Sequence, residues 1–118
     1  SLGLAADSAV QVAKNGTYEV VRHANITYGQ GQIGSHWQMN DVKVKNLTLD
    51  YYEPKISSAG LKPAMLVIHG GAYWTGDKSD DVIVKTANYY ASAGWATFCI
   101  DYRLVFELIF SYQTFFRV

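Results

Sequence analysis

The sequence has little cysteine, no excess of charge of either sign and no long apolar run. Its one cysteine, Cys99, lies inside an apolar stretch and cannot form an intramolecular disulfide, which predicts a small buried side chain. Ten basic and ten acidic residues give a formal net charge of zero, so the electrostatic footprint of a nucleic-acid or anionic-membrane binder is missing. No stretch approaches the roughly 18 consecutive apolar residues that span a bilayer. We therefore expect no nucleic-acid partner and no membrane span.

The length and composition fit a single globular domain. The chain has 118 residues, of which 49% are hydrophobic and 17% are charged, so it can bury a core. Residues 1–16 precede the first strand pattern and are interpreted as an N-terminal extension. We expect neither a metal ion nor an organic cofactor, and the sequence leaves the oligomeric state open.

Glycosylation sequons favour an extracellular protein. Three of the five asparagines, Asn15, Asn25 and Asn46, begin an N-x-T triplet. The small residues among positions 1–6 are of the kind found near a signal-peptide cleavage site. We expect secretion, with a cytoplasmic location as the alternative, because threonine is common in strands and creates sequons there by chance.

A dinucleotide-binding pattern, G-x-G-x-x-G, runs from Gly29 to Gly34, after a strand predicted over residues 17–28 and interrupted at polar residues 22–25. A true fingerprint opens a helix that crosses over to the next strand. Only residues 35–41 separate Gly34 from the next strand pattern, and they are too few for that crossover. We interpret the glycines as a flexible loop that carries His36 and Trp37. A nucleotide-binding fragment would instead need a helix that starts near Gly34.

The next segment is predicted to be a strand. Residues 42–51 alternate apolar with polar side chains almost without fault, which is typical of a strand with one solvent-facing side. Pro54 lacks a backbone N–H and is expected to end the hydrogen-bond ladder.

Two apolar runs with a helix pattern between them predict a βαβ unit. The runs cover residues 64–68, interpreted as a buried strand, and residues 95–101. Between them, Ser79 or Asp80 can cap a helix and Gly94 can end it. Its apolar residues at helical spacing are Ile83, Ala87, Tyr90 and Ala91. We expect the two strands to be parallel, with a right-handed connection.

A glycine-rich segment directly follows the first apolar run. It reads His69-Gly70-Gly71-Ala72-Tyr73-Trp74-Thr75-Gly76-Asp77-Lys78. Two adjacent glycines after a strand let the backbone bend sharply and approach a ligand closely, since neither carries a Cβ. His-Gly-Gly alone is also compatible with a plain strand-to-loop turn.

With Trp74, Gly76, Asp77 and Lys78 at matching positions, this segment resembles the oxyanion-hole loop of the α/β-hydrolase esterases. The branch that it resembles is close to feruloyl-esterase-like, hormone-sensitive-lipase-like and kynurenine-formamidase-like enzymes. Leu49-Asp50-Tyr51-Tyr52-Glu53-Pro54 is similar to the end of the second strand in that branch, and Asp101-Tyr102-Arg103-Leu104 to the segment after the fourth. The resemblance covers residues 47–104. It implies an α/β fold, the N-terminal part of an α/β-hydrolase sheet with antiparallel first strands and then a parallel βαβ unit.

The resemblance also implies roles for the loop residues. The backbone N–H groups of Gly71 and Ala72 would hold the oxyanion, with His69 and Gly70 as loop support. Tyr73 and Trp74 would contact the substrate, a small-molecule ester. Many relatives have glycine where this chain has Ala72; alanine keeps the N–H donor but narrows the room for a bulky acyl group. Asp101 and Arg103 are expected to hold loops near the site without being catalytic.

The nucleophile motif of these relatives is missing from the 118 residues. After D-Y-R-L they continue into A-P-E, a further helix and a G-x-S-x-G elbow, and no serine here has that context. Residues 105–118 form an atypical aromatic-rich tail instead. We interpret residues 1–118 as one incomplete α/β-hydrolase domain, ending before the nucleophile elbow and inactive alone.

Two alternative functions remain open at this point. An arylformamidase-like amide hydrolase would use the same loop in the same way, so the sequence does not distinguish an ester substrate from an amide substrate. A non-catalytic binding module could use Trp37, Trp74 and the nine tyrosines as a recognition surface.

Overall fold

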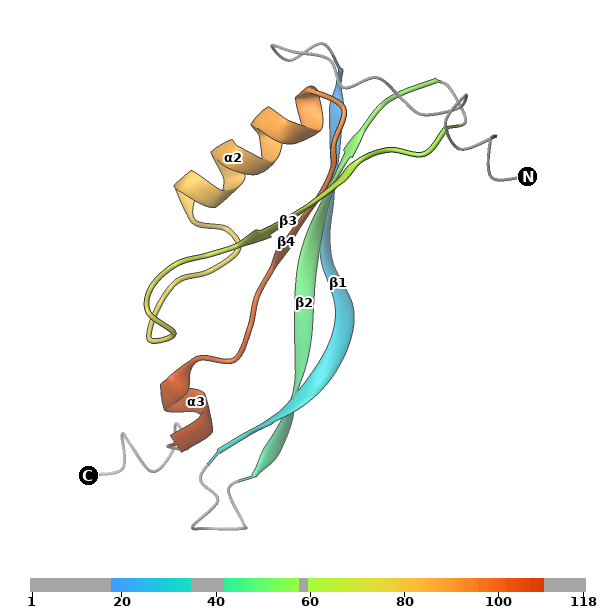
Figure 1. The fold of residues 1–118 in the computed structure, drawn as a ribbon. Coiled ribbons are helices and arrows are strands. Elements are labelled where there is room, and N and C mark those ends of the chain that lie inside the picture. Colours follow the sequence, from blue (N-terminus) through green and yellow to red (C-terminus); the bar gives the residue numbers. More distant parts are fainter. Residues whose placement is uncertain (1–17, 35–41, 58–59, 110–118) are drawn as a thin grey trace.

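The computed structural model describes residues 18–34, 42–57 and 60–109, which form a mixed four-stranded sheet with helices beside it (Figure 1). The strands are β1 (Val20–Ile33), β2 (Lys43–Pro54), β3 (Ala64–Ile68) and β4 (Ala96–Ile100), and the helices are α2 (Asp81–Ser92) and α3 (Val105–Ile109). In the order β1-β2-β4-β3, the first two pairings are antiparallel and the last is parallel. This topology confirms the fold class predicted from the sequence.

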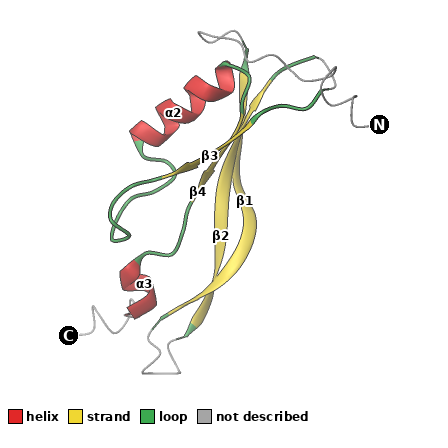
Figure 2. Ribbon diagram, viewed as in Figure 1, coloured by secondary structure: helices red, strands yellow, loops and turns green. Residues whose placement is uncertain are grey.

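Strands β1 and β2 form the long antiparallel pair that extends through the molecule (Figure 2). Gly29 and Gly31 lie inside β1, opposite Leu47 and Lys45, so the prediction of a flexible loop is wrong for these glycines. Pairing with β2 extends the strand through them. Gly31 also leaves room for Arg103, whose Nε would lie 2.8 Å from a Cβ at this position. His36 and Trp37, like the extension at residues 1–16, lie outside the described residues.

The antiparallel pairing also excludes the dinucleotide-binding interpretation of the glycine pattern. That interpretation requires a helical crossover to a parallel strand, whereas β2 returns directly alongside β1. The interruption predicted at residues 22–25 is a bulge and not a break. The register shifts between His23 and Ile26, and Asn25 adopts a φ of 57°. A bulge keeps the strand paired while it changes the direction of a side chain.

Helix α2 covers one face of the sheet and forms the core with it. Its buried residues are Ile83, Ala87 and Ala91, which pack against Tyr52 and Cys99 of the sheet. The helix follows Asp80 and ends before Gly94, which has a φ of 104°. Burial raises the pKa of the Cys99 thiol to about 11, so this cysteine stays protonated and unreactive at neutral pH, as its apolar surroundings predict.

The other face of the sheet is more open, which corrects the prediction of a buried strand at residues 64–68. Strand β3 is the terminal strand, and Leu66 and Ile68 are 58% and 57% exposed. Leu66 lies in register with Phe98, which stacks on Tyr51 at a centroid distance of 4.7 Å. The apolar run predicts the strand correctly. Which side chains of the strand are buried depends on the face of the sheet that α2 covers.

Helix α3 contains the first residues of the predicted tail. The N–H of Gly34 donates to the carbonyl of Glu107, and Lys45 forms an ion pair with the Glu107 carboxylate. These contacts fasten α3 to the far end of the β1-β2 pair. Within the described ranges, neither helix is long and apolar enough to cross a membrane.

Candidate functional site

The loop at residues 69–78 leaves the carboxyl end of β3 and closes into a tight turn. The N–H groups of Trp74 and Thr75 both donate to the carbonyl of Gly71, at 3.0 and 3.2 Å. Gly71 has a φ of 121°, and a Cβ there would lie 2.0 Å from the Thr75 carbonyl oxygen. At Gly76, whose φ is 107°, a Cβ would lie 2.3 Å from the Gly70 carbonyl oxygen. Both positions therefore require glycine.

The two residues after Gly71 also have positive φ angles, although both carry side chains. Ala72 has a φ of 53° and Tyr73 of 65°. A residue other than glycine in this region costs on the order of 1 kcal/mol, and such strained positions gather at functional sites. The backbone of the turn is thus held in a conformation that local preferences disfavour.

The contacts of His69 support the turn from below. The side chain is buried, and its Nδ1 lies 2.9 Å from the Gly70 carbonyl oxygen. Because a carbonyl only accepts, Nδ1 carries the proton. Tyr102 stacks on the imidazole at 4.2 Å and donates its hydroxyl hydrogen to the His69 carbonyl at 2.8 Å. His69 thus contacts the loop and the segment after β4.

Residues after β4 hold the loop and the hairpin together. The Asp101 carboxylate accepts from the backbone N–H of Lys78 at 2.7 Å, and its second oxygen lies 3.7 Å from Lys78 Nζ. Arg103 donates to the Gln32 carbonyl at 3.0 Å, and the N–H of Val105 donates to the Tyr73 carbonyl at 2.8 Å. Asp101 thus connects the segment after β4 to the loop, and Arg103 connects it to β1. This is the structural role expected for them.

A buried carboxylate lies beneath the loop. Asp50 on β2 is fully buried and accepts hydrogen bonds from the Arg22 side chain and from the Asn25 N–H, and its Oδ1 lies 3.2 Å from Lys78 Nζ. Burial alone would raise the pKa of Asp50, but the Asn25 N–H, Arg22 and Lys78 together hold it below its usual value. Asp50 is therefore ionised at neutral pH.

Sequence reasoning missed the meeting of these groups. Asp50 and Lys78 belong to the two motifs that carried the family resemblance, but nothing in their spacing of 28 residues predicts contact. The alternating pattern gave no signal for this contact, because Asp50 falls on its polar side, in phase with Thr48, whereas the structure buries Asp50 fully.

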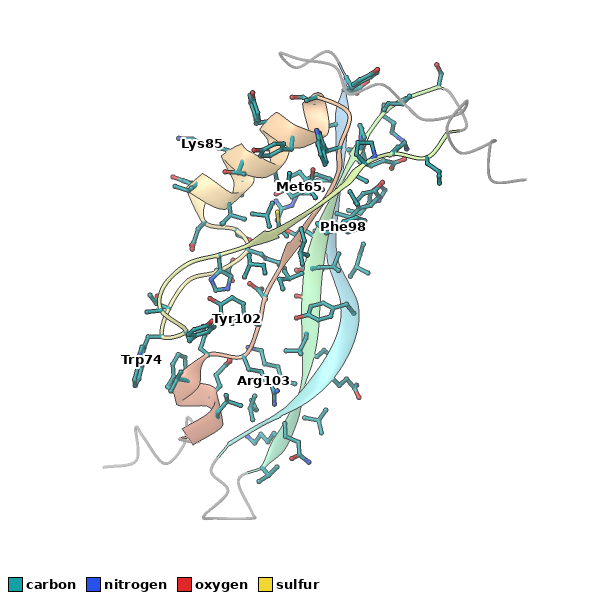
Figure 3. The ribbon with its side chains drawn as sticks, in the orientation of Figure 1. Met65, Trp74, Lys85, Phe98, Tyr102 and Arg103 are labelled. Atoms are coloured by element: carbon teal, nitrogen blue, oxygen red, sulfur yellow. The ribbon has the colours of Figure 1, made fainter. Side chains whose placement is uncertain are left out.

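An open hollow of about 560 Å³ lies between the loop and the start of α2. Gly70, Gly71, Thr75 and Gly76 line one part of it, and Asp77, Asp80, Val82 and Ile83 line the rest. Tyr73 and Trp74 are not among the lining residues and are 67% and 57% exposed. Figure 3 shows Trp74 at the outer end of the loop, pointing away from the body of the molecule. The structure therefore brings Gly70 and Gly71 to the hollow, but Ala72 and the two aromatic residues predicted to contact substrate are not among its lining residues.

A metal centre has no support in the residues that the structure describes. In that part of the chain, His, Cys, Asp and Glu side chains do not gather in groups of three or more that could hold a metal ion.

Comparison with known proteins identifies what this arrangement resembles. The model of the BD-FAE family matches residues 49–114, more than half of the chain, and extends past Leu104, where the resemblance seen in the sequence stops. No curated protein gave a match. Among solved structures, the fold is similar to that of esterase B from Lactobacillus Rhamnosis (HN001), with a TM-score of 0.50 and 24% identity over 78% of this chain. The chain spans about a quarter of the length of that esterase, 25%.

Proposed function

The chain belongs to the BD-FAE family of α/β-hydrolase esterases, and from this premise we propose that its loop after β3 supplies the oxyanion hole of a serine carboxylic ester hydrolase. The donors are the backbone N–H groups of Gly71 and Ala72. The observation that carries the proposal is the run of positive φ angles from Gly71 to Tyr73, at the carboxyl end of a parallel strand and beside an open hollow.

The hydrogen bonding of the loop leaves these donors available. The turn closes on the carbonyl of Gly71 and uses the N–H groups of Trp74 and Thr75. Among the described residues, no hydrogen bond uses the N–H of Gly71 or Ala72. Backbone donors fixed in advance are what a developing alkoxide requires, because they cost no reorganisation during the reaction, and each contributes about 10² to 10³ in rate.

In the proposed reaction, a serine attacks the ester carbonyl, a histidine carries the proton, and the loop stabilises the negative oxygen of the tetrahedral intermediate. His69 and Gly70 support the loop through their mutual hydrogen bond. The exposed aromatic rings of Tyr73 and Trp74 contact the part of the substrate that lies outside the hollow. The Ala72 methyl group limits the size of the acyl group.

The nucleophilic serine has no counterpart in the motifs of this chain, since no G-x-S-x-G occurs in the 118 residues. We therefore expect the chain alone to show no measurable ester turnover. Without a nucleophile, an oxyanion hole keeps at most about 10³ to 10⁴ of acceleration over water, and only if substrate binds. Saturable hydrolysis of p-nitrophenyl acetate by the chain alone, lost in Gly71→Pro, would contradict this part of the proposal.

A chimera tests the loop in a complete enzyme. Residues 18–104 replace the structurally matching part of esterase B, and hydrolysis of p-nitrophenyl acetate is compared between the chimera and its Gly71→Pro variant. Because proline removes one donor and the positive φ, kcat is expected to fall by at least about 10². Gly29→Ala, where a Cβ meets nothing within 4 Å, is the matched control.

The outcomes separate the remaining functions. A folded, active chimera that keeps its kcat after Gly71→Pro contradicts the oxyanion role. A chimera that hydrolyses an aryl formamide in preference to the ester supports the amide-hydrolase alternative.

The proposal includes secretion. Asn25 and Asn46 of the sequons lie on β1 and β2, and the Asn25 Oδ1 that accepts from Lys78 Nζ would remain available, because a glycan is attached through the amide nitrogen. A mobility shift on glycosidase treatment of the chain expressed through a eukaryotic secretory route is the expected result. Unchanged mobility contradicts it.

A further inference from the structure

Three segments far apart in the sequence meet at the buried ammonium group of Lys78. Its Nζ lies 2.8 Å from Asn25 Oδ1 on β1, 3.2 Å from Asp50 Oδ1 on β2 and 3.7 Å from Asp101 Oδ2 after β4. The Lys78 side chain is only 7% exposed. Its own backbone N–H donates to Asp101 as well. Both the main chain and the side chain of Lys78 are therefore fixed.

The bulge in β1 supplies two of the contacts in this cluster. The left-handed conformation of Asn25 directs its N–H to Asp50 Oδ1 at 2.9 Å, and its side-chain oxygen accepts from Lys78. Asparagine tolerates this conformation better than most residues, because its short polar side chain can bond locally. The bulge thus has a use beyond strand pairing: it satisfies both members of a buried ion pair.

Lys78 is joined to the proposed oxyanion donors through a short and crowded backbone. Gly76 packs so closely against the start of the loop that a Cβ there would lie 2.4 Å from His69 Nδ1. Between Gly76 and Gly71, the N–H groups of Trp74 and Thr75 both donate to the Gly71 carbonyl. A displacement of Lys78 would therefore be transmitted to Gly71, because the two ends of the loop touch.

We infer that Lys78, held by Asp50, Asn25 and Asp101, is the positioning residue of the loop and fixes the backbone orientation of Gly71 and Ala72. The catalytic meaning of this inference rests on the proposed oxyanion role. The statement that Lys78 fixes the backbone of the loop does not depend on that role. Lys78 touches neither substrate nor reacting atoms; it acts through the loop.

The experiment reads the Gly71 and Ala72 amide signals of the isotopically labelled full chain by ¹H–¹⁵N NMR. Lys78→Met keeps the length of the side chain and removes its charge, while Lys85→Met on the exposed face of α2 is the matched control (Figure 3). We expect the two amide signals to leave their native positions in Lys78→Met and to keep them in Lys85→Met. Native positions in a folded Lys78→Met overturn the inference.

A second pair of variants separates positioning from stability. Lys78→Met alone leaves Asp50 with less compensation, whereas the Asp50→Asn/Lys78→Met double variant removes both charges. We expect the double variant to regain much of its thermal stability while the Gly71 and Ala72 signals stay displaced. A merely structural role predicts that both recover together, and that result overturns the inference.

A milder variant covers the case in which those proteins do not fold. Asn25→Gly accommodates the positive φ and keeps every charge, but it removes the oxygen that accepts from Lys78. Displaced Gly71 and Ala72 signals are expected, and unchanged signals contradict the inference.

Activity of the chimera distinguishes this inference from the proposed function. Lys78→Met is expected to lower kcat with little change in KM. If Gly71→Pro leaves the chimera active, the oxyanion role fails while the NMR result on loop geometry stands. If Gly71→Pro abolishes activity and Lys78→Met leaves kcat unchanged, the positioning role fails alone.

Discussion

The chain has two segments with closely spaced glycines, one in β1 and one after β3. The first is part of a paired strand, whereas the second forms a tight turn. Gly29 lies in a paired strand, and a Cβ added there would meet nothing within 4 Å, so it is a strand residue that happens to be glycine. Gly71 has a positive φ, and a Cβ there would lie 2.0 Å from backbone. Gly29 could therefore be replaced without a clash, whereas Gly71 could not.

The segments also differ in what holds them. The hydrogen-bond ladder with β2, which shifts register at two places, holds most of the β1 segment, and Arg103 adds a side-chain hydrogen bond to the Gln32 carbonyl. The loop after β3 has a short turn of its own and depends on its own Lys78 side chain and on Asp101 and Tyr102 from the segment after β4. Changes to these side chains should affect the loop and spare the hairpin.

The largest effect is expected at the buried carboxylate. Asp50→Asn removes the charge that compensates Lys78, and breaking a buried ion pair in this way costs about 3 kcal/mol. Urea unfolding followed by circular dichroism measures the loss. A loss below about 1 kcal/mol would show that the loop is held without the ion pair.

The same carboxylate predicts a dependence on acid. Because the pKa of Asp50 is lower in the folded than in the unfolded chain, its stabilisation is complete above the ordinary aspartate pKa of about 3.9 and disappears as the pH falls through the folded value. The loop amides should therefore lose protection from hydrogen exchange in acid before the hairpin amides do. Asp50→Asn should remove this part of the pH dependence; an identical acid profile in the variant contradicts the assignment.

The next effect distinguishes the two glycines directly. Gly71→Ala places a methyl group against the Thr75 backbone at a φ that alanine disfavours, and the expected cost is about 2 kcal/mol. Gly29→Ala is expected to change the free energy of unfolding by less than about 1 kcal/mol, with stabilisation the favoured direction. Equal costs at the two positions would remove the distinction drawn between the segments.

A smaller effect is expected at Tyr102. Tyr102→Phe keeps the ring stacked on His69 but loses the hydrogen bond to the His69 carbonyl, which contributes about 1 kcal/mol. The exchange rate of the loop amides should rise, with the hairpin amides as an internal control. Faster exchange in both segments would show a general loss of stability instead.

What the sequence determined by itself are the features whose cause is local. Alternation in residues 42–51 predicts β2, helical spacing before Gly94 predicts α2, and two apolar runs around that helix predict the parallel βαβ unit. The period of these patterns predicts the type of element. It did not predict the buried side of β2, where Asp50 of the polar side is fully buried. The order of the motifs around His69 likewise pointed to the esterase family that the comparison shows.

Tertiary structure alone decided the rest, because it depends on contacts between segments that no local pattern encodes. Pairing with β2 made strand residues of Gly29 and Gly31, and Leu66 and Ile68 are exposed because they lie on the face of β3 that α2 does not cover. The cluster beneath the loop joins Lys78 to Asn25, 53 residues away, through one hydrogen bond. Burying an unpaired charge costs free energy, so buried charges are paired. Which charges form a pair depends on which residues the fold brings together.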